Sequence, residues 1–162
     1  MIESPNQSIT IKRVKLKDIA LVLSLFDKYR VFYQKESDVK GAQEFLTERL
    51  TNNESVIFTA LLNEADTSIP VGFTQLYPTF SSGRMSKNWI LNDLYVDAGY
   101  RTRGIGKQLI ETAKQFARKD GAKFVKLETA HDNRTAQSVY EGIGFKQYNP
   151  HDGFLTYKID LN

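Results

Sequence analysis

The residues from Ala98 to Ile110 combine glycines with cations and include no acidic side chain. The glycines and cations of this stretch are Arg101, Arg103, Gly104, Gly106 and Lys107. They stand where an amphipathic helix is predicted to begin. A helix N-terminus carries a partial positive charge, so each cation there is unfavourable by about 0.3–1 kcal/mol. A bound anion removes this conflict, because glycine leaves backbone N–H groups bare and able to point at phosphate oxygens. The stretch therefore predicts a phosphate-binding site.

Two common phosphate-binding loops do not fit this stretch. The dinucleotide fingerprint requires a third glycine where the segment 104–109 has Leu109, and no early βαβ unit precedes it. A P-loop requires G-x-x-x-x-G-K-[ST], which residues 99–107 do not supply. The plainer alternative also stays open, that the glycines only form a turn and the cations are solvated.

A second group of residues shares one stripe of a predicted helix. Asn133, Ala136 and Tyr140 follow the spacing i, i+3 and i+7. An amide, a small residue and a phenol on one stripe suit a ligand, because alanine permits close approach and the phenol can donate a proton. The alternative is that Asn133 only caps the helix and Tyr140 is a core aromatic.

Three segments together resemble the GNAT superfamily of N-acyltransferases. Arg101-x-x-Gly104-x-Gly106 resembles the R/Q-x-x-G-x-G/A loop that binds the cofactor's pyrophosphate in that superfamily. Leu94-Tyr95-Val96 resembles the strand segment whose backbone pairs with the pantetheine arm. Asn133-x-x-Ala136-x-x-x-Tyr140, followed by Gly144-Phe145, resembles the second cofactor motif. The order of predicted elements also matches, so the resemblance covers about residues 9–160.

The resemblance implies acetyl-CoA as donor and an α+β, single-domain fold, with a mixed β-sheet flanked by about four helices. It implies that Leu94 and Val96 bond the pantetheine through their main chain and that Tyr140 lies beside the thioester sulfur. The residues implied to bind the cofactor are Leu94, Tyr95, Val96, Arg101, Thr102, Arg103, Gly104, Ile105, Gly106, Lys107, Asn133, Ala136 and Tyr140.

Acetyl transfer to an amine requires a neutral amine, hydrogen-bond donors for the carbonyl oxygen, and a proton for the departing thiolate. The chain has no cysteine to carry the acetyl group, so we expect direct attack in a ternary complex. We expect Tyr140 to protonate the sulfur. A backbone N–H near Tyr95 or Val96 is expected to polarise the carbonyl.

The general base is sought among three carboxylates. Asp93 directly precedes the implied pantetheine strand, and Glu128 and Glu54 are alternatives. Some amine-acetylating relatives carry an acid where Asn92 stands, so a water chain from Asp93 is one expectation. The alternative is that Asp93 is a buried, hydrogen-bonded acid without a catalytic role.

We expect the acceptor site between the first two predicted helices and the strands near residues 71–77 and 89–96. Aromatic faces attract cationic amines, although aromatic residues also simply pack. The expected acceptor is a primary amine of a small molecule, polyamine-like or amino-acid-like, or of a peptide. The expected lining residues are Tyr29, Tyr33, Tyr77, Trp89 and Asn92.

Hydrophobic periodicity places these residues on a series of strands and helices. Residues 1–8 form a polar tail, and residues 9–162 one α+β domain. Asp18 is the expected N-cap of the first helix, whose apolar face ends at Tyr29, and a second helix covers Val39–Leu50. The other expected elements are a hairpin at 55–62 and 71–77, strands at 89–96, 124–129, 145–148 and 154–159, and helices at 104–120 and 133–141.

Composition limits the alternatives. The chain has 162 residues, of which 41% are hydrophobic, and this indicates one globular domain. Its 22 basic and 19 acidic residues give a net charge of +3, which produces only a weak electrostatic field. It has no cysteine and two histidines twenty positions apart, so we expect no disulfide and no metal site. No signal peptide or membrane span fits, and the cytoplasm is the expected location.

Two alternative functions also follow from the sequence. A non-catalytic acyl-CoA-binding module would carry the same cofactor motifs. A nucleic-acid-binding domain is less consistent, because the cations are scattered and paired with acids. A homodimer is a further expectation, since an edge strand such as Phe154–Ile159 could pair with a second copy.

Overall fold

A computed structural model describes residues 7–147, 155 and 157–161 of the chain. The chain divides into two compact units, Met1–Glu128 and Thr129–Asn162, and each is described by itself. The prediction of one domain over residues 9–162 stays a prediction.

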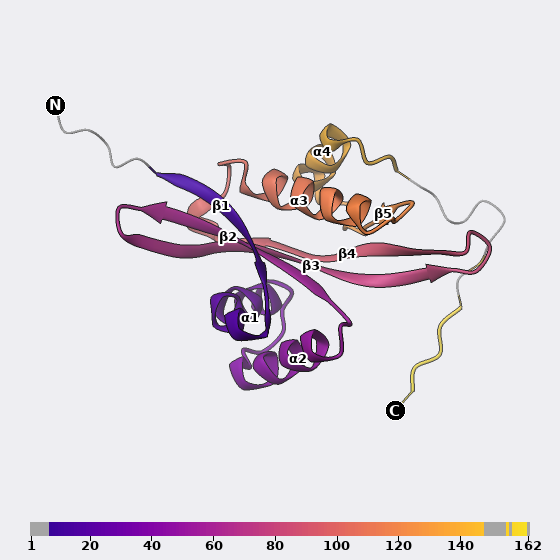
Figure 1. The fold of residues 1–162 in the computed structure, drawn as a ribbon, viewed down its shortest axis with the longest axis horizontal. Helices are drawn as coiled ribbons and strands as arrows, with labels where there is room; N and C mark the ends of the chain where they lie inside the picture. Colours follow the sequence, from indigo (N-terminus) through magenta and orange to yellow (C-terminus); the bar gives the residue numbers. More distant parts are fainter. Residues whose placement is uncertain (1–6, 148–154, 156, 162) are drawn as a thin grey trace. The chain divides into compact units, whose positions relative to one another are not determined.

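The first unit is built on one mixed sheet. Its strands are β1 (Ser8–Val14), β2 (Val56–Glu64), β3 (Thr67–Ser81), β4 (Ser86–Val96) and β5 (Val125–Lys126). They lie in the order β1-β2-β3-β4-β5, and all neighbours are antiparallel except β4 and β5, which are parallel (Figure 1). The α+β class with a mixed sheet is therefore confirmed.

Two hairpins form most of the sheet. Polar turns join β2 to β3 and β3 to β4, and Ala65 and Met85 in these turns have positive φ angles of 49° and 46°. The predicted hairpin is confirmed, although β3 runs well beyond the predicted range 71–77. The expected strand 124–129 is reduced to Val125–Lys126.

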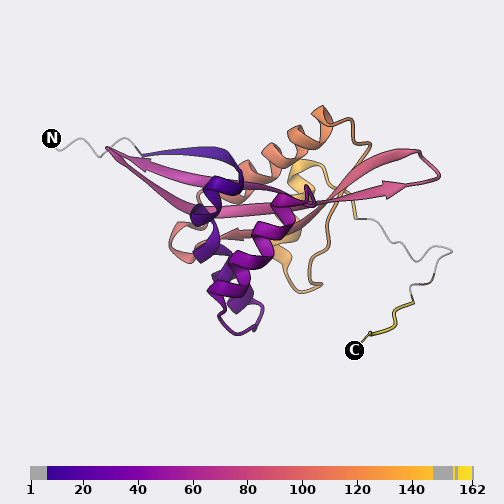
Figure 2. The same cartoon turned by 60° about the horizontal axis from the view of Figure 1, so that its bottom comes forward.

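Two helices cover one face of the sheet (Figures 1 and 2). They are α1 (Leu23–Phe32) and α2 (Val39–Thr51), and a 3-10 helix, η1 (Leu16–Leu21), precedes them. The expectation that Asp18 caps an α-helix is wrong, because Asp18 lies inside η1 and accepts a hydrogen bond from the Lys15 N–H at 3.2 Å. Apolar residues three apart fit both kinds of helix, so their spacing could not separate them.

The core under these helices consists of buried side chains from both helices and three strands. Leu46 of α2 is fully buried as predicted, and Leu50 is partly buried. Phe45, also predicted to point inward, keeps 37% of its surface exposed. The core residues are Val14, Val22, Leu25, Phe26, Ala42, Leu46, Ile57 and Phe73.

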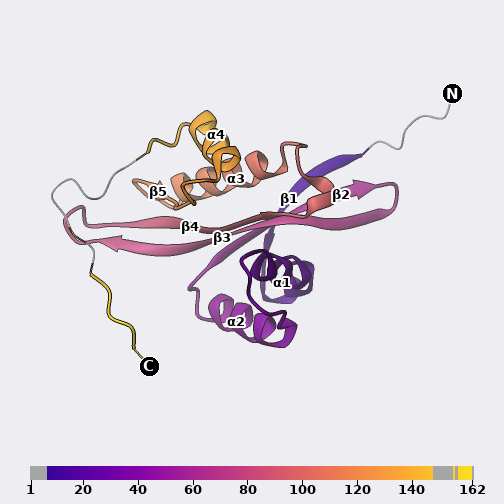
Figure 3. The same cartoon turned by 180° about the vertical axis from the view of Figure 1, so that it is seen from behind.

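The opposite face of the sheet carries α3 (Ile105–Lys119), which follows a short 3-10 helix, η2 (Ala98–Tyr100) (Figure 3). The helix packs closely on β3 at Gly72. A Cβ there would lie 2.9 Å from the Tyr95 carbonyl oxygen and 3.4 Å from Ile105. Glycine is therefore required at this contact. The residues of α3 that are buried are Ile105, Leu109, Ile110, Ala113 and Ala117.

The second unit contains α4 (Arg134–Ile143), which confirms the predicted helix at 133–141. It ends at Gly144 in the left-handed conformation, with φ of 104°. The predicted strands 145–148 and 154–159 are not formed by residues 145–147, 155 and 157–159; residues 148, 154 and 156 lie outside the described part. Alternating apolar and polar residues predict which side of a strand is buried, but a strand forms only where a neighbouring strand can pair with it. Within the described residues, no helix is both long and apolar enough to cross a bilayer.

Candidate active site

A β-bulge in β4 sets the direction of the side chains around the site. Gln75 of β3 pairs with Asp93, whereas Leu76 pairs with Leu91, so Asn92 is the extra residue. A bulge shifts the alternation of side chains along a strand. Trp89, before the bulge, therefore faces α3, and Asp93, after it, faces α1.

The bulge removes Trp89 from the expected acceptor site. The indole is 3% exposed, packs on Phe116 of α3 at 5.1 Å and donates to Asp120 at 2.9 Å. It therefore lies on the opposite face of the sheet from Tyr29 and Tyr33. The expectation that Trp89 lines the acceptor site with these tyrosines is therefore wrong, because the bulge turns Trp89 and Asp93 to opposite faces of the sheet.

Asp93 is the centre of a buried polar network on the α1 face. It is 4% exposed, and its carboxylate accepts from Gln75 Nε2 at 2.7 Å and from Asn92 Nδ2 at 3.0 Å, with the Tyr29 phenol beside it. A carboxylate offers about four lone-pair positions. Gln75 and Asn92 occupy two of them, so about two positions stay open for further proton donors.

The phenols beside Asp93 are held in their protonated form. Burial, and then the negative charge of Asp93, raises the pKa of Tyr29 well above its ordinary value, and the same two causes raise the pKa of Tyr77. The hydroxyl of Tyr77 accepts from Gln75 Nε2 at 3.1 Å, so its own hydrogen is directed elsewhere. Tyr33 packs edge-on against Tyr29 at 5.0 Å. These side chains gather on one face with Asn92.

Gln75 is the residue that sequence reasoning missed. Its side-chain nitrogen bonds both Asp93 and Tyr77, while its buried Oε1 has no hydrogen-bond partner among the described residues. An isolated glutamine within a strand gives no signal of this role. Only the register with Asp93 reveals it.

The C-terminal half of β4 presents a free edge on the side away from β3. Within the described chain, β5 pairs only with Trp89 and Ile90. The Asp97 N–H donates to Val71 O at 2.9 Å, and main-chain groups alternate in direction along a strand. The N–H and C=O groups of Leu94 and Val96 therefore point toward the free edge, whereas those of Tyr95 point toward β3.

The expected phosphate loop forms the N-terminus of α3. Gly104 is the N-cap and has φ of +73°, a conformation that favours glycine. The Gln108 N–H donates to Gly104 O at 3.1 Å, so the N–H groups of Ile105, Gly106 and Lys107 have no acceptor within the helix. No acidic residue occupies the first turn. These bare donors fit a diphosphate.

Two arginines stand beside this N-terminus on the exposed loop. The guanidinium of Arg101 lies over the rings of Phe32 and Tyr95, at 5.5 and 5.6 Å, and its Nε donates to Val96 O at 2.9 Å. Arg103 lies over Tyr100 at 5.5 Å. Thr102 between them is exposed and has a positive φ of 63°.

The three carboxylates considered as bases differ in their surroundings. Glu128 is exposed just after β5, and Glu54 is exposed and pairs with Arg49 at 2.5 Å. Only Asp93 is buried among polar side chains. Among the described residues, no three of His, Cys, Asp or Glu are grouped so that they could hold a metal.

The second unit contains the other predicted motif. Asn133 is the N-cap of α4, and its side chain accepts from the Ala136 N–H at 3.2 Å. Tyr140 is half-buried, and its ring packs against Phe145 at 6.1 Å.

Comparison with known proteins identifies related chains. Residues 22–145 match the family model described as Acetyltransferase (GNAT) family. N-acetyltransferase YhfO of Bacillus subtilis is 44% identical over 94% of this chain and 98% of its own. A probable acetyltransferase of Haemophilus influenzae is 32% identical over 80% of this chain and 84% of its own. A crystal structure of a probable acetyltransferase superposes with a TM-score of 0.84 at 38% identity, over 94% of this chain and 98% of that one.

Proposed function

This chain belongs to the GNAT family of acetyltransferases, whose acyl donor is acetyl-CoA, and we propose that it acetylates a primary amine of a small molecule or peptide. The observation that carries the proposal is the position of Asp93. This buried carboxylate directly precedes Leu94 in β4. The main-chain groups of Leu94 and Val96 point to the free edge of that strand. A proton acceptor thus stands beside a row of main-chain donors.

Acetyl-CoA supplies an acetyl group activated as a thioester. The bare N–H groups of Ile105, Gly106 and Lys107 would hold its diphosphate, and the nearby guanidinium groups of Arg101 and Arg103 would compensate its charge. Leu94 and Val96 would bond the pantetheine arm through their main chain. Asn133, Ala136 and Tyr140 keep the cofactor contacts that the family resemblance implies.

The residues on the α1 face prepare the acceptor. An open lone-pair position of Asp93 accepts a proton from the acceptor's ammonium group, directly or through one water molecule. The Gln75 and Asn92 amides keep the carboxylate in place. The neutral amine attacks the thioester carbon directly, and a main-chain N–H of Leu94 or Val96 donates to the acetyl oxygen. As the C–S bond breaks, the Tyr140 hydroxyl gives its proton to the departing sulfur. The proton that the new amide nitrogen loses then restores the Tyr140 hydroxyl, directly or through water.

The test is an assay of thiol release. Acetyl-CoA is mixed with the protein and a panel of amines that includes a diamine, an amino acid and a peptide with a free N-terminus. The chain has no cysteine and adds no thiol signal of its own. We expect thiol release that depends on the amine, together with a rise in melting temperature when CoA is added. A rise in melting temperature without amine-dependent release would instead identify a non-catalytic CoA-binding module.

A further inference from the structure

A shallow groove of about 620 Å³, largely open to solvent, lies beside the Asp93 network in the first unit. Phe45 and Arg49 of α2, Glu54 of the following loop, and Tyr77 and Phe80 of β3 contribute to its walls. Tyr77 belongs to both the groove and the network, because Gln75 Nε2 bonds its hydroxyl at 3.1 Å and Asp93 at 2.7 Å. The groove therefore begins where the Asp93 network ends.

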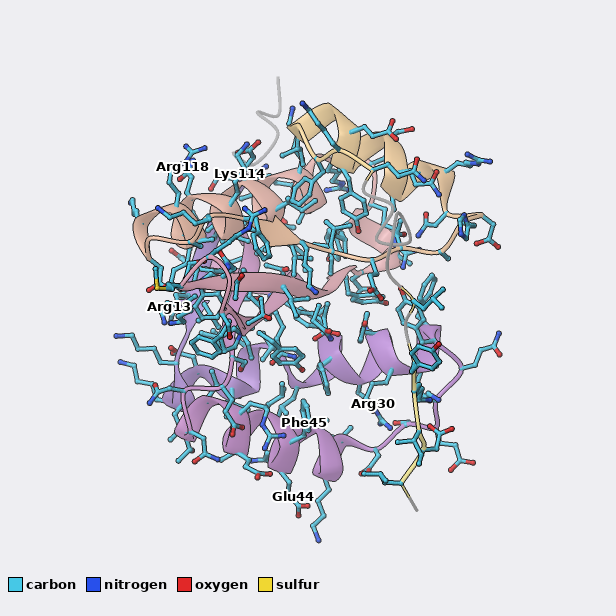
Figure 4. All side chains as sticks on the ribbon, turned by 90° about the vertical axis from the view of Figure 1, so that its right-hand side faces the viewer. Arg13, Arg30, Glu44, Phe45, Lys114 and Arg118 are labelled. Carbon is cyan, nitrogen blue, oxygen red and sulfur yellow. The ribbon has the colours of Figure 1, made fainter. Side chains whose placement is uncertain are left out.

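The walls of this groove expose aromatic rings. Phe80 is 75% exposed and Phe45 is 37% exposed. The neighbouring Leu46 of α2 is fully buried, so Phe45 lies at the edge of the core and not inside it. Figure 4 shows Phe45 on the sheet-facing side of α2, whereas Glu44 points away from the sheet. Aromatic faces bind cations, and one cation is already bound in this way, since the Arg49 guanidinium lies 4.9 Å from the centre of the Phe45 ring.

The charges at the groove favour a positive ligand. Arg49 pairs with Glu54 of the groove at 2.5 Å and with Glu48, outside the groove, at 2.9 Å, so its positive charge is already compensated. An anionic ligand would have to displace a carboxylate from Arg49. A cationic ligand needs no displacement, because the Glu54 side chain is 49% exposed and the Phe80 ring is also accessible.

We propose that this groove binds the body of a cationic acceptor, a linear amine with a second protonated nitrogen. The reacting amine lies at Asp93 and Tyr77, and the second nitrogen lies between Glu54 and Phe80. The proposal rests on the proposed function, and it adds the acceptor's class: a diamine or longer polyamine rather than a monoamine or an amino acid.

The first experiment compares acceptors that differ only at the far end. Diaminopentane, pentylamine and aminopentanoate carry a cation, no charge and an anion there. We expect kcat/KM for diaminopentane to exceed that for pentylamine about tenfold, with aminopentanoate the poorest. Equal values for the first two acceptors, or a preference for aminopentanoate, would overturn the proposal and leave the acetyltransferase activity standing.

Two variants then test the groove. Glu54→Gln and Phe80→Ala should each reduce the preference for diaminopentane severalfold and leave kcat/KM for pentylamine nearly unchanged. Glu44→Gln is the matched control, because it removes the same charge from the outward side of α2, where Glu44 pairs only loosely with Lys40 at 3.8 Å. A loss by Glu54→Gln that is equal for both acceptors would overturn the proposal, since it would indicate Glu54 as the base.

A binding experiment separates the subsite from the chemistry. Diaminopentane is titrated calorimetrically into the wild-type protein saturated with CoA, and then into Glu54→Gln. Weaker binding to the variant supports the groove even if no turnover is seen, in which case only the proposed catalysis fails. Unchanged binding overturns the groove.

Discussion

The two faces of the sheet at β4 offer different physical means of binding a ligand. On the α3 face, the expected cofactor contacts are main-chain N–H groups at an exposed helix N-terminus, with Arg101 and Arg103 on the loop before it. On the α1 face, the contacts are side chains of a buried network, with Asp93 4% exposed and Gln75 fully buried.

This difference determines which substitutions each face tolerates. Main-chain donors survive most changes of side chain, so the cofactor face should lose affinity in modest steps. In a buried network, each side chain is the hydrogen-bond partner of another, so one substitution leaves several buried polar groups without partners. We therefore expect substitutions on the cofactor face to raise the Kd for CoA, and substitutions on the acceptor face to lower kcat.

The largest effect is expected from a residue in the second unit. Tyr140→Phe removes the proposed proton donor to the sulfur and should lower kcat about 10²–10⁴-fold, the range of one general acid. The Kd for CoA should change little, because the ring is retained. Steady-state kinetics with calorimetry of CoA binding would measure both values. Near-normal turnover would exclude this role for Tyr140.

Asp93→Asn should give the next largest effect, a fall in kcat of about 10²-fold, since water could still accept the proton. The new side-chain NH2 group would also face the NH2 group of Gln75 or of Asn92, and two donors cannot form a hydrogen bond. This loss should destabilise the fold by about 1–3 kcal/mol. Glu128→Gln is the control on an exposed carboxylate. If Asp93→Asn is less stable but retains its turnover, Asp93 is only structural.

Arg101→Ala tests the proposed cofactor loop and should act on binding alone. The loss of one charge-assisted contact should raise the Kd for CoA about tenfold to a hundredfold, with kcat at saturation nearly retained. The exposed Lys119 at the other end of α3 provides the control variant Lys119→Ala. A large fall in kcat for Arg101→Ala would break the proposed division between the two faces.

The same difference explains how much could be predicted from the sequence. The cofactor loop is contiguous, so glycine and cation spacing predicted where the helix begins at Gly104. The acceptor face joins residues far apart in sequence, and the role of Gln75 depends on strand register. The bulge at Asn92 also reversed the expected direction of Trp89. The polar pair Asn92-Asp93 within an otherwise apolar strand was the one available signal of that bulge.

The smallest predicted effect is a pH dependence of the acceptor face. Burial, with a contribution from Asp93, raises the pKa of Tyr29 and of Tyr77, so in the folded protein both phenols bind protons at a pH where unfolded tyrosine has lost them. Their contribution to stability is therefore complete below about pH 10, the ordinary tyrosine pKa, and declines as the pH rises above it. Urea unfolding followed across this range should show the decline, and phenolate absorbance should show two tyrosines that ionise late.

The variants connect this titration to the network. Tyr77→Phe should remove one late phenol and make the alkaline decline in stability less steep. Asp93→Asn should retain most of the delay, because burial is the larger cause of both pKa shifts. If all tyrosines ionised together, these phenols would be solvated, and the proposed contrast between an exposed cofactor face and a buried acceptor face would not hold.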